Sequence, residues 1–278
     1  MATAVLDRLD TRRLALRLRR HVLRMCNLGG SSHVGSCLSI ADITAVLYGA
    51  VLRHDPARPD WPDRDRFILS KGHAAACVYA VLAEQGFFSA NNLDDYYRNG
   101  SRLSGHVSAK GVPGVEFSTG SLGHGLGVAA GMAFQLRRLG GKQRTFVLLG
   151  DGECDEGSVW EAAMFAAHHK LGRLCAIVDY NKLQSLGPVA DTIGLEPFDA
   201  KWASFGWRVV HVNGHDHEAL HGALARPGNP DDPPLCLIAH TIKGAGVPFM
   251  ENQVLWHYRV PRGPEYDAAL EALGDEDA

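Results

Sequence analysis

The middle of the chain, residues 144–183, has the pattern of a strand, a helix and a second strand. Residues 145–149 and 174–180 are short apolar runs, which are typical of buried strands. Between them, residues 159–170 are predicted to form a helix that Ser158 caps. Elements in this order make a βαβ unit, whose two strands lie parallel in one sheet.

Polar side chains follow both predicted strands. Asp151 stands between two glycines after the first strand, and Asn181 follows the second. Parallel strands bring both residues to the carboxyl edge of the sheet, where open α/β folds bind ligands. Carboxylate and amide oxygens suit Mg²⁺, and the glycines let a diphosphate approach the backbone. Such strands also end in Asp, Asn or Gly simply to turn the chain, so this segment alone leaves both interpretations open.

Three further strand-like runs alternate with helical patterns, at residues 66–69, 207–212 and 235–239. This alternation predicts an α/β fold with one doubly wound, mostly parallel sheet and helices on both faces. The 278 residues are 46% hydrophobic, which is enough to bury a full core. We expect a single domain over residues 1–278 that ends in an acidic tail near residues 272–278.

The composition argues against several function classes. A net charge of −3 gives no electrostatic footprint for nucleic acid or an anionic membrane. The helix expected near residues 11–26 is basic, but the acidic total favours a solvated face for its arginines over nucleic-acid binding. No apolar run reaches the roughly 18 residues of a membrane span. The six cysteines form no CxxC pair and lie mostly in apolar runs, so we expect reduced, buried thiols and a cytoplasmic location.

The chain has 14 histidines, an unusually high number. Five of them adjoin glycine, serine or a strand end: His33, His73, His106, His124 and His257. Neutral imidazoles exchange protons with hydroxyl and carbonyl groups near pH 7, so several in one cleft would suit carbohydrate chemistry. Sequence spacing does not indicate whether these side chains converge.

One motif points to a different enzyme class. His217, Glu218 and His221 match the HExxH pattern of zinc hydrolases. Asp216 precedes them as a helix cap, which predicts that the motif occupies the exposed first turn of a short helix. No histidine follows at the spacing of a third ligand. A solvated helix start is therefore favoured over a zinc site.

From about Arg13 to Arg262 the chain resembles the N-terminal, thiamine-diphosphate-binding half of transketolase. The matching segments occur in the family's order: SSHVGSCLSIADI, HDPARPDWPDRDRFILSKGHAAA, GHVSAKGVPGVEFSTGSLGHGLGVAAGMA, GDGECDEGSVWEA, DYNKL and HTIKGAGV. The family's thiamine motif is GDG followed after about thirty residues by NN. Tyr180 replaces the first Asn here, whereas Asn181 keeps the second, metal-binding one. His124 replaces a glutamine that is common in full-length transketolases.

The resemblance implies a set of site residues. The expected ligands of Mg²⁺, or of Ca²⁺ or Mn²⁺ in its place, are Asp151, Asn181 and the carbonyl of Leu183. The expected contacts to thiamine diphosphate are His73, Gly120, Ser121, Leu122, His124, Gly152, Asn181, Lys243 and His257. The expected catalytic residues are His33, His73, His106, His257 and Glu156, of which Glu156 resembles the acid that joins the two halves of the active dimer.

The family's remaining cofactor and phosphate contacts come from a second domain that does not follow residue 262. The resemblance therefore implies the N-terminal subunit of a split transketolase, inactive alone and active with a C-terminal subunit in an α2β2 heterotetramer. Such an enzyme transfers a two-carbon ketol unit from a ketose to an aldose. Two alternatives stay open: a split enzyme for a branched or sulfonated sugar, and a non-catalytic scaffold subunit.

Overall fold

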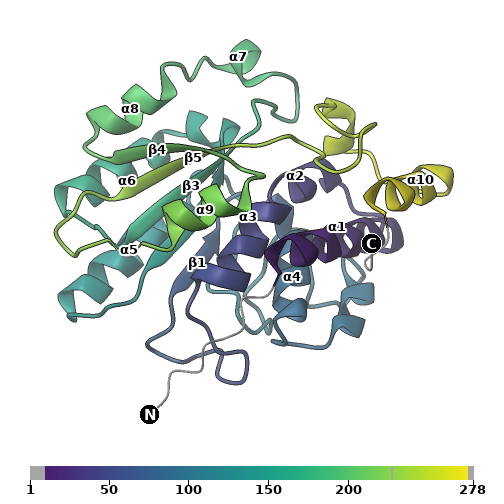
Figure 1. Cartoon of the computed structure of the whole chain (residues 1–278), viewed down its shortest axis with the longest axis horizontal. Coiled ribbons are helices and arrows are strands. Elements are labelled where there is room, and N and C mark those ends of the chain that lie inside the picture. The colour runs from purple at the N-terminus through teal and green to yellow at the C-terminus, as the bar shows by residue number, and fades with distance from the viewer. Residues whose placement is uncertain (1–9, 227, 275–278) are drawn as a thin grey trace.

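The computed structural model describes residues 10–226 and 228–274. A five-stranded sheet runs through its centre, between two layers of helices (Figure 1). The strands are β1 (Arg66–Leu69), β2 (Thr145–Gly150), β3 (Leu174–Tyr180), β4 (Arg208–Asn213) and β5 (Leu235–His240). They are ordered β1-β2-β3-β5-β4, and every pairing is parallel. The predicted fold class and all five predicted strands are confirmed.

Alternate residues of each strand face opposite layers, as the two-residue period of a strand requires. In β2, Phe146 and Leu148 join one apolar core, whereas Val147 and Leu149 join the other. This double burial explains why the strands are apolar on both faces. The first core packs against α1 (Thr11–Gly29), α2 (Val34–Ser39), α3 (Ala41–Val46), α4 (Ala75–Glu84), α9 (His217–Leu224) and α10 (Pro264–Leu273). The second packs against α5 (Gly125–Arg138), α6 (Gly157–His168), α7 (Val189–Thr192) and α8 (Phe198–Ser204).

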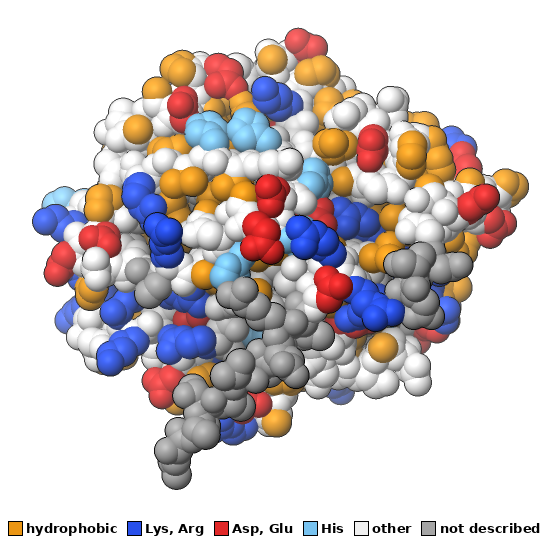
Figure 2. All heavy atoms as spheres, in the orientation of Figure 1, with side chains coloured by type: hydrophobic (Ala, Val, Ile, Leu, Met, Phe, Trp, Pro, Cys, Tyr) orange, Lys and Arg blue, Asp and Glu red, His pale blue; other side chains and the backbone are white. Residues whose placement is uncertain are grey.

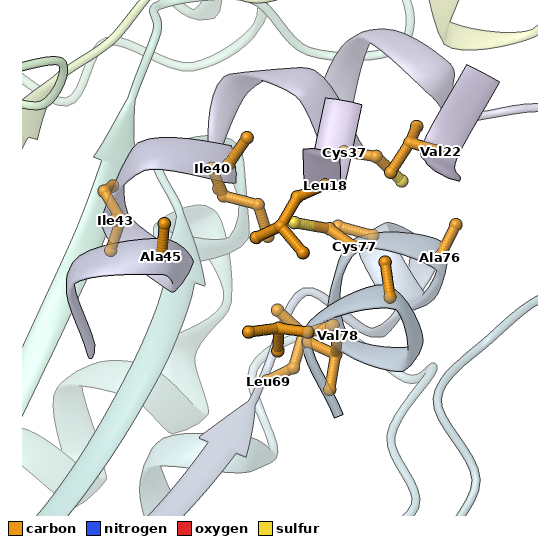
Figure 3. Packing of buried hydrophobic residues seen from close by; sticks show 14 of the residues in the cluster. Leu18, Val22, Cys37, Ile40, Ile43, Ala45, Leu69, Ala76, Cys77 and Val78 are labelled. Carbon is orange, nitrogen blue, oxygen red and sulfur yellow. The ribbon is translucent and has the colours of Figure 1, made fainter. Parts of the chain in front are cut away.

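The first core is the larger cluster. Leu18 of α1, Ile40 between α2 and α3, and Cys77 of α4 meet within it (Figure 3). All six cysteines are buried free thiols, as predicted. On the face shown in Figure 2, acidic and basic side chains are intermingled, which agrees with the small net charge. None of the helices within the described residues has the length and apolar character that a membrane span needs.

Several local predictions need correction. The helix after β2 begins at Gly157, and Ser158 does not cap it, because its hydroxyl donates to the carbonyl of Gly123. Arg19 of the basic helix is buried rather than solvated, because it pairs with Asp42. Of the expected acidic tail, residues 272 and 273 belong to α10, and residues 275–278 lie outside the described residues.

Candidate active site

The ends of β2 and β3 bring the two predicted metal ligands to one edge of the sheet. Gly150 pairs with Asp179 in the parallel register, so Asp151 and Asn181 follow neighbouring strand ends. The Asp151 carboxylate accepts a hydrogen bond of 2.7 Å from the Gly152 N–H and one of 2.5 Å from the Lys182 N–H. The two turns are thus joined through Asp151.

Asn181 is oriented by its neighbours on both sides of the amide. Its Nδ2 donates to Asp179 Oδ2 at 3.0 Å, and its Oδ1 accepts from the Leu183 N–H at 3.0 Å. The amide oxygen is therefore directed to the turn where the Leu183 carbonyl lies. Carboxylate, amide and carbonyl oxygens in one turn region are the donor set that Mg²⁺ prefers, so these residues fit a divalent ion.

A buried ion pair lies beneath this edge. Lys71 Nζ, after β1, donates to Asp179 Oδ2 at 2.5 Å, and both side chains are almost fully buried. Burial alone would raise the pKa of Asp179, but Lys71 and the hydroxyls of Ser39 and Thr241 hold that pKa below its usual value. Asp179 is thus a fixed negative charge that also orients Asn181.

The charge state of Asp151 depends on its surroundings. Burial, together with the nearby Asp179 carboxylate, raises the pKa of Asp151 to about 7. Its carboxylate is therefore costly to keep ionised at this position without a cation. A divalent ion at this point would favour the ionised form.

Four of the five singled-out histidines converge above the sheet edge. The ring centroid of His33 lies 5.2 Å from that of His73, 5.7 Å from His106 and 4.9 Å from His257. The centroids of His73 and His257 are 5.5 Å apart. These rings come from four separate segments: the turn before α2, the turn after β1, the loop before α5 and the turn containing residues 254–257.

Three of these imidazoles, those of His33, His73 and His257, are held in the neutral form. Burial, then the neighbouring His106, lowers the pKa of His33 to about 4. Burial, then Lys243, lowers the pKa of His257 to about 3. Burial also places the pKa of His73 well below its usual value. Neutral rings at pH 7 can both donate and accept protons at sugar hydroxyls.

Lys243 connects the histidines to the turn that carries the predicted metal ligands. Its Nζ lies 3.0 Å from the Leu183 carbonyl oxygen and 3.0 Å from His257 Nδ1. Burial, then repulsion from Lys71, lowers the pKa of Lys243 to about 8. Lys243 lines the cavity, where its ammonium group would attract a diphosphate.

These groups enclose one cavity of about 260 Å³. Most of the predicted site residues line it: His33, His73, His106, Gly120, Leu122, Asp151, Gly152, Asn181, Leu183, Lys243 and His257. Ser121, His124 and Glu156 do not line it, and all three are exposed. His124 is instead the residue before α5, and Glu156 is the residue before α6.

Several lining residues were not predicted from the sequence: Ser36, Lys71, Glu153, Gln184, Ser185 and Tyr258. Asp179, which holds Asn181, was not predicted either. A signal for the buried pair was present, because Lys71 and Asp179 are charged residues at the ends of two predicted buried strands, and buried charges need partners. Glu153 lies buried in the short helical turn after β2, Gly152–Asp155, and accepts hydrogen bonds from Ser70, Gly123 and Gly150.

The zinc alternative does not fit the structure. His217 is buried rather than in an exposed first turn, and both its ring nitrogens have partners. Nδ1 lies 2.8 Å from Thr11 Oγ1, and Nε2 lies 3.0 Å from Asp42. The predicted cap is confirmed, because Asp216 accepts from the N–H groups of Glu218 and Ala219.

Comparison with known proteins identifies the same family along nearly the whole chain. Residues 11–276 match the family described as transketolase, thiamine diphosphate binding domain. The chain is 42% identical to an apulose-4-phosphate transketolase subunit of Actinobacillus succinogenes, over 97% of each chain. It is 36% identical to a 6-deoxy-6-sulfo-D-fructose transketolase subunit of Clostridium sp., over 98% of this chain and 99% of that one.

A solved structure has the same fold. The transketolase of Campylobacter jejuni superposes with a TM-score of 0.87 at 30% identity and is matched by the whole of this chain. This chain spans 44% of that solved chain.

Proposed function

Because the chain belongs to the transketolase family and carries its thiamine-diphosphate-binding domain, we propose that it is the N-terminal subunit of a two-subunit transketolase. It transfers a two-carbon ketol unit from a ketose to an aldose. The observation that carries this proposal is the convergence of four histidines over the edge formed by Asp151 and Asn181.

The chain's own residues hold the cofactor and its ion. Asp151, Asn181 and the Leu183 carbonyl bind Mg²⁺, or Ca²⁺ or Mn²⁺ in its place, because they present hard oxygen donors in one turn region. Lys243 and the backbone at Gly152 face the diphosphate, since both line the cavity beside those ligands. Gly120, Leu122 and His73 line the same cavity and complete the cofactor contacts. Ser121 and His124 are exposed outside the cavity lining, so they would contact the cofactor only from its open side.

When bound, thiamine diphosphate supplies a nucleophilic carbon and an electron sink for cleavage of the ketose C2–C3 bond. The histidines position the sugar and move its protons. His33 and His106 bind donor hydroxyls, and the low pKa of His33 keeps its ring able to accept a proton from such a hydroxyl. His257 and His73 lie against His33 and exclude water from the same wall of the cavity.

A separate C-terminal subunit completes the site, with α2β2 as the assembled form. Two observations support this part. Three of the relatives that match this chain over more than nine-tenths of their length carry the word subunit in their names. Tyr258 and Leu122 line the cavity yet expose 60% and 36% of their surface, as side chains at the rim of an interface do. Glu156 is exposed, and in the assembled form it would share one proton with a carboxylate of the partner subunit, because two ionised carboxylates would repel each other.

The substrate class follows from the same relatives. Their names specify apulose 4-phosphate and 6-deoxy-6-sulfo-D-fructose as the sugars that they act on. These names favour a split ketol transferase that acts on a modified sugar over one that acts on ordinary sugar phosphates. A scaffold role is disfavoured, because the oxygen donors and the histidine set are all in place. The cytoplasm is the proposed location, in keeping with six free buried thiols.

The proposal is tested by reconstitution. The purified chain is mixed with a C-terminal transketolase subunit, Mg²⁺, thiamine diphosphate and a ¹³C-labelled ketose with an aldose acceptor. Transfer of the labelled two-carbon unit only when both subunits are present supports the proposal. Full turnover by this chain alone contradicts the split arrangement, and absence of transfer from every ketose by a complex that binds the cofactor contradicts the activity.

A further inference from the structure

A charged cluster outside the cavity is centred on Asp42 of α3. Its carboxylate accepts two hydrogen bonds from Arg19, from NH1 at 3.0 Å and from NH2 at 2.6 Å. His215 Nδ1 lies 2.6 Å from Oδ2, and His217 Nε2 lies 3.0 Å from Oδ1. We call Arg19, Asp42, His215 and His217 the Asp42 cluster. It joins α1 and α3 to the turn after β4 and to the first residue of α9, and none of its members lines the active-site cavity.

Two members of the Asp42 cluster hold the segment that follows β5. His215 Nε2 accepts a hydrogen bond of 2.9 Å from the Ile242 N–H. Because this nitrogen accepts, the proton of the neutral ring is on Nδ1, which then donates to Asp42. On the other side, Arg19 Nε donates to the Ala245 carbonyl at 3.0 Å. The two contacts fix the backbone just before and just after Lys243.

Lys243 is the residue that this segment brings into the cavity. Its ammonium group reaches the Leu183 carbonyl and His257 Nδ1, both at 3.0 Å. The segment is otherwise rich in glycine, and Gly244 and Gly246 adopt positive φ angles of 84° and 93°. Glycines leave the backbone free to take other conformations, so contacts from outside must select this one.

We propose that the Asp42 cluster positions Lys243, through the Ile242 N–H and the Ala245 carbonyl, for contact with the cofactor's diphosphate. Arg19, Asp42 and His215 are thus positioning residues for the site. The contact between Lys243 and the diphosphate rests on the function proposed above. The fixing of the backbone on both sides of Lys243 does not.

A purely structural role would instead tie α1, α3 and α9 together without affecting the segment around Lys243. The chain offers a matched control, because His217 binds the same carboxylate but contacts Thr11 rather than that segment. His215→Ala and His217→Ala each remove one hydrogen bond of Asp42. Only His215→Ala removes the Ile242 contact.

The first measurement is hydrogen exchange at the Ile242 amide in the full chain. We expect His215→Ala to speed this exchange about tenfold, which is the effect of losing one hydrogen bond. We expect His217→Ala to change the exchange rate by less than about twofold. His215→Gln restores protection, since an amide side chain can donate to Asp42 and accept from the Ile242 N–H. Equal exchange rates in the two alanine variants, or unchanged exchange in His215→Ala, overturn the proposal.

The second measurement is Mg²⁺-dependent binding of thiamine diphosphate to the complex with a C-terminal subunit. We expect His215→Ala to weaken binding about three- to tenfold, and Lys243→Ala at least as much. Unchanged binding in Lys243→Ala contradicts the proposed cofactor contact, while the Ile242 exchange still decides whether the cluster holds the segment. Weaker binding in Lys243→Ala with unchanged binding in His215→Ala overturns the positioning role. Arg24→Ala is the folding control. Arg24 is on the same helix as Arg19, but its substitution removes an exposed ion pair with Asp94 and none of the contacts of the Asp42 cluster.

Discussion

The Asp151 carboxylate, after β2, accepts a hydrogen bond of 2.5 Å from the backbone N–H of Lys182, after β3. This contact closes the edge of the sheet between two neighbouring parallel strands. It places a carboxylate beside the turn that contains Asn181 and Leu183. The proposed metal-dependent cofactor site requires this arrangement.

The first prediction concerns Asp151 itself. Asp151→Asn keeps the shape of the side chain but removes the charge that a divalent ion needs, so Mg²⁺-dependent binding of thiamine diphosphate should fall by about 100-fold or more. The free energy of unfolding of the metal-free chain should change little, because two effects oppose each other. The substitution removes a charge that burial disfavours. It also leaves one of the two backbone N–H groups, which bond to different oxygens of Asp151, without its acceptor. Calorimetric titration and urea unfolding measure the two effects. A variant that binds the cofactor normally would contradict the assignment.

Metal binding should also depend on pH. The pKa of Asp151 is raised to about 7 in the metal-free chain, so below that pH a proton occupies the ligand and competes with the ion. Affinity for Mn²⁺, followed by electron paramagnetic resonance, should therefore fall by up to about tenfold per pH unit below pH 7 and level off above it. If Mn²⁺ affinity did not change between pH 5.5 and pH 8, the ion would not displace a proton from Asp151.

The buried histidines predict a loss of stability in acid. The folded-state pKa of His33, about 4, lies below the ordinary value of 6.5, so between these values the unfolded chain binds more protons. The free energy of unfolding should therefore decrease as the pH falls from 6.5 toward 4. His33→Asn should make this decrease smaller, because it removes one of the buried histidines. The decrease should not disappear, since His73 and His257 also have lowered pKa values. Asn also tolerates the positive φ of 71° at this position. Urea unfolding at pH 7 and pH 5 measures how much the free energy of unfolding falls between these two pH values. An equal fall in the unsubstituted chain and in His33→Asn would contradict the prediction.

The ion pair beneath the site should be costly to break. Lys71→Met leaves the buried Asp179 carboxylate without its cation, which should cost about 3–5 kcal/mol of unfolding free energy. Adding Asp179→Asn should recover part of that loss, because no unpaired charge then remains buried. Denaturant unfolding of both single variants and the double variant gives the coupling energy. A loss below about 1 kcal/mol in Lys71→Met would mean that water reaches the pair.

Periodic sequence patterns were enough to predict the sheet. Each strand is mostly apolar and is followed by a polar or glycine residue. Parallel pairing then places Asp151 and Asn181 after neighbouring strand ends. The helix boundaries were predicted less accurately, since α6 begins at Gly157 rather than at residue 159 after a Ser158 cap. Glycine has a low helix propensity, so local pattern alone does not favour this start.

The histidine cluster could not be predicted from spacing. His33, His106 and His257 lie in loops far apart in the sequence, and no local rule fixes how distant loops approach each other. Burial of Arg19 and His217 was missed for a related reason. Their partner Asp42 is on another helix, so the surface helix pattern that each shows by itself is misleading. The family resemblance supplied what the spacing did not.

The central claim is most directly tested by a crystal structure of the assembled enzyme with thiamine diphosphate and Mn²⁺, using the anomalous signal of the metal. The account predicts one peak at about 2.0–2.3 Å from an Asp151 oxygen, Asn181 Oδ1 and the Leu183 carbonyl oxygen. A peak elsewhere in a cofactor-loaded site, or a loaded site with no peak beside Asp151 and Asn181, would contradict it.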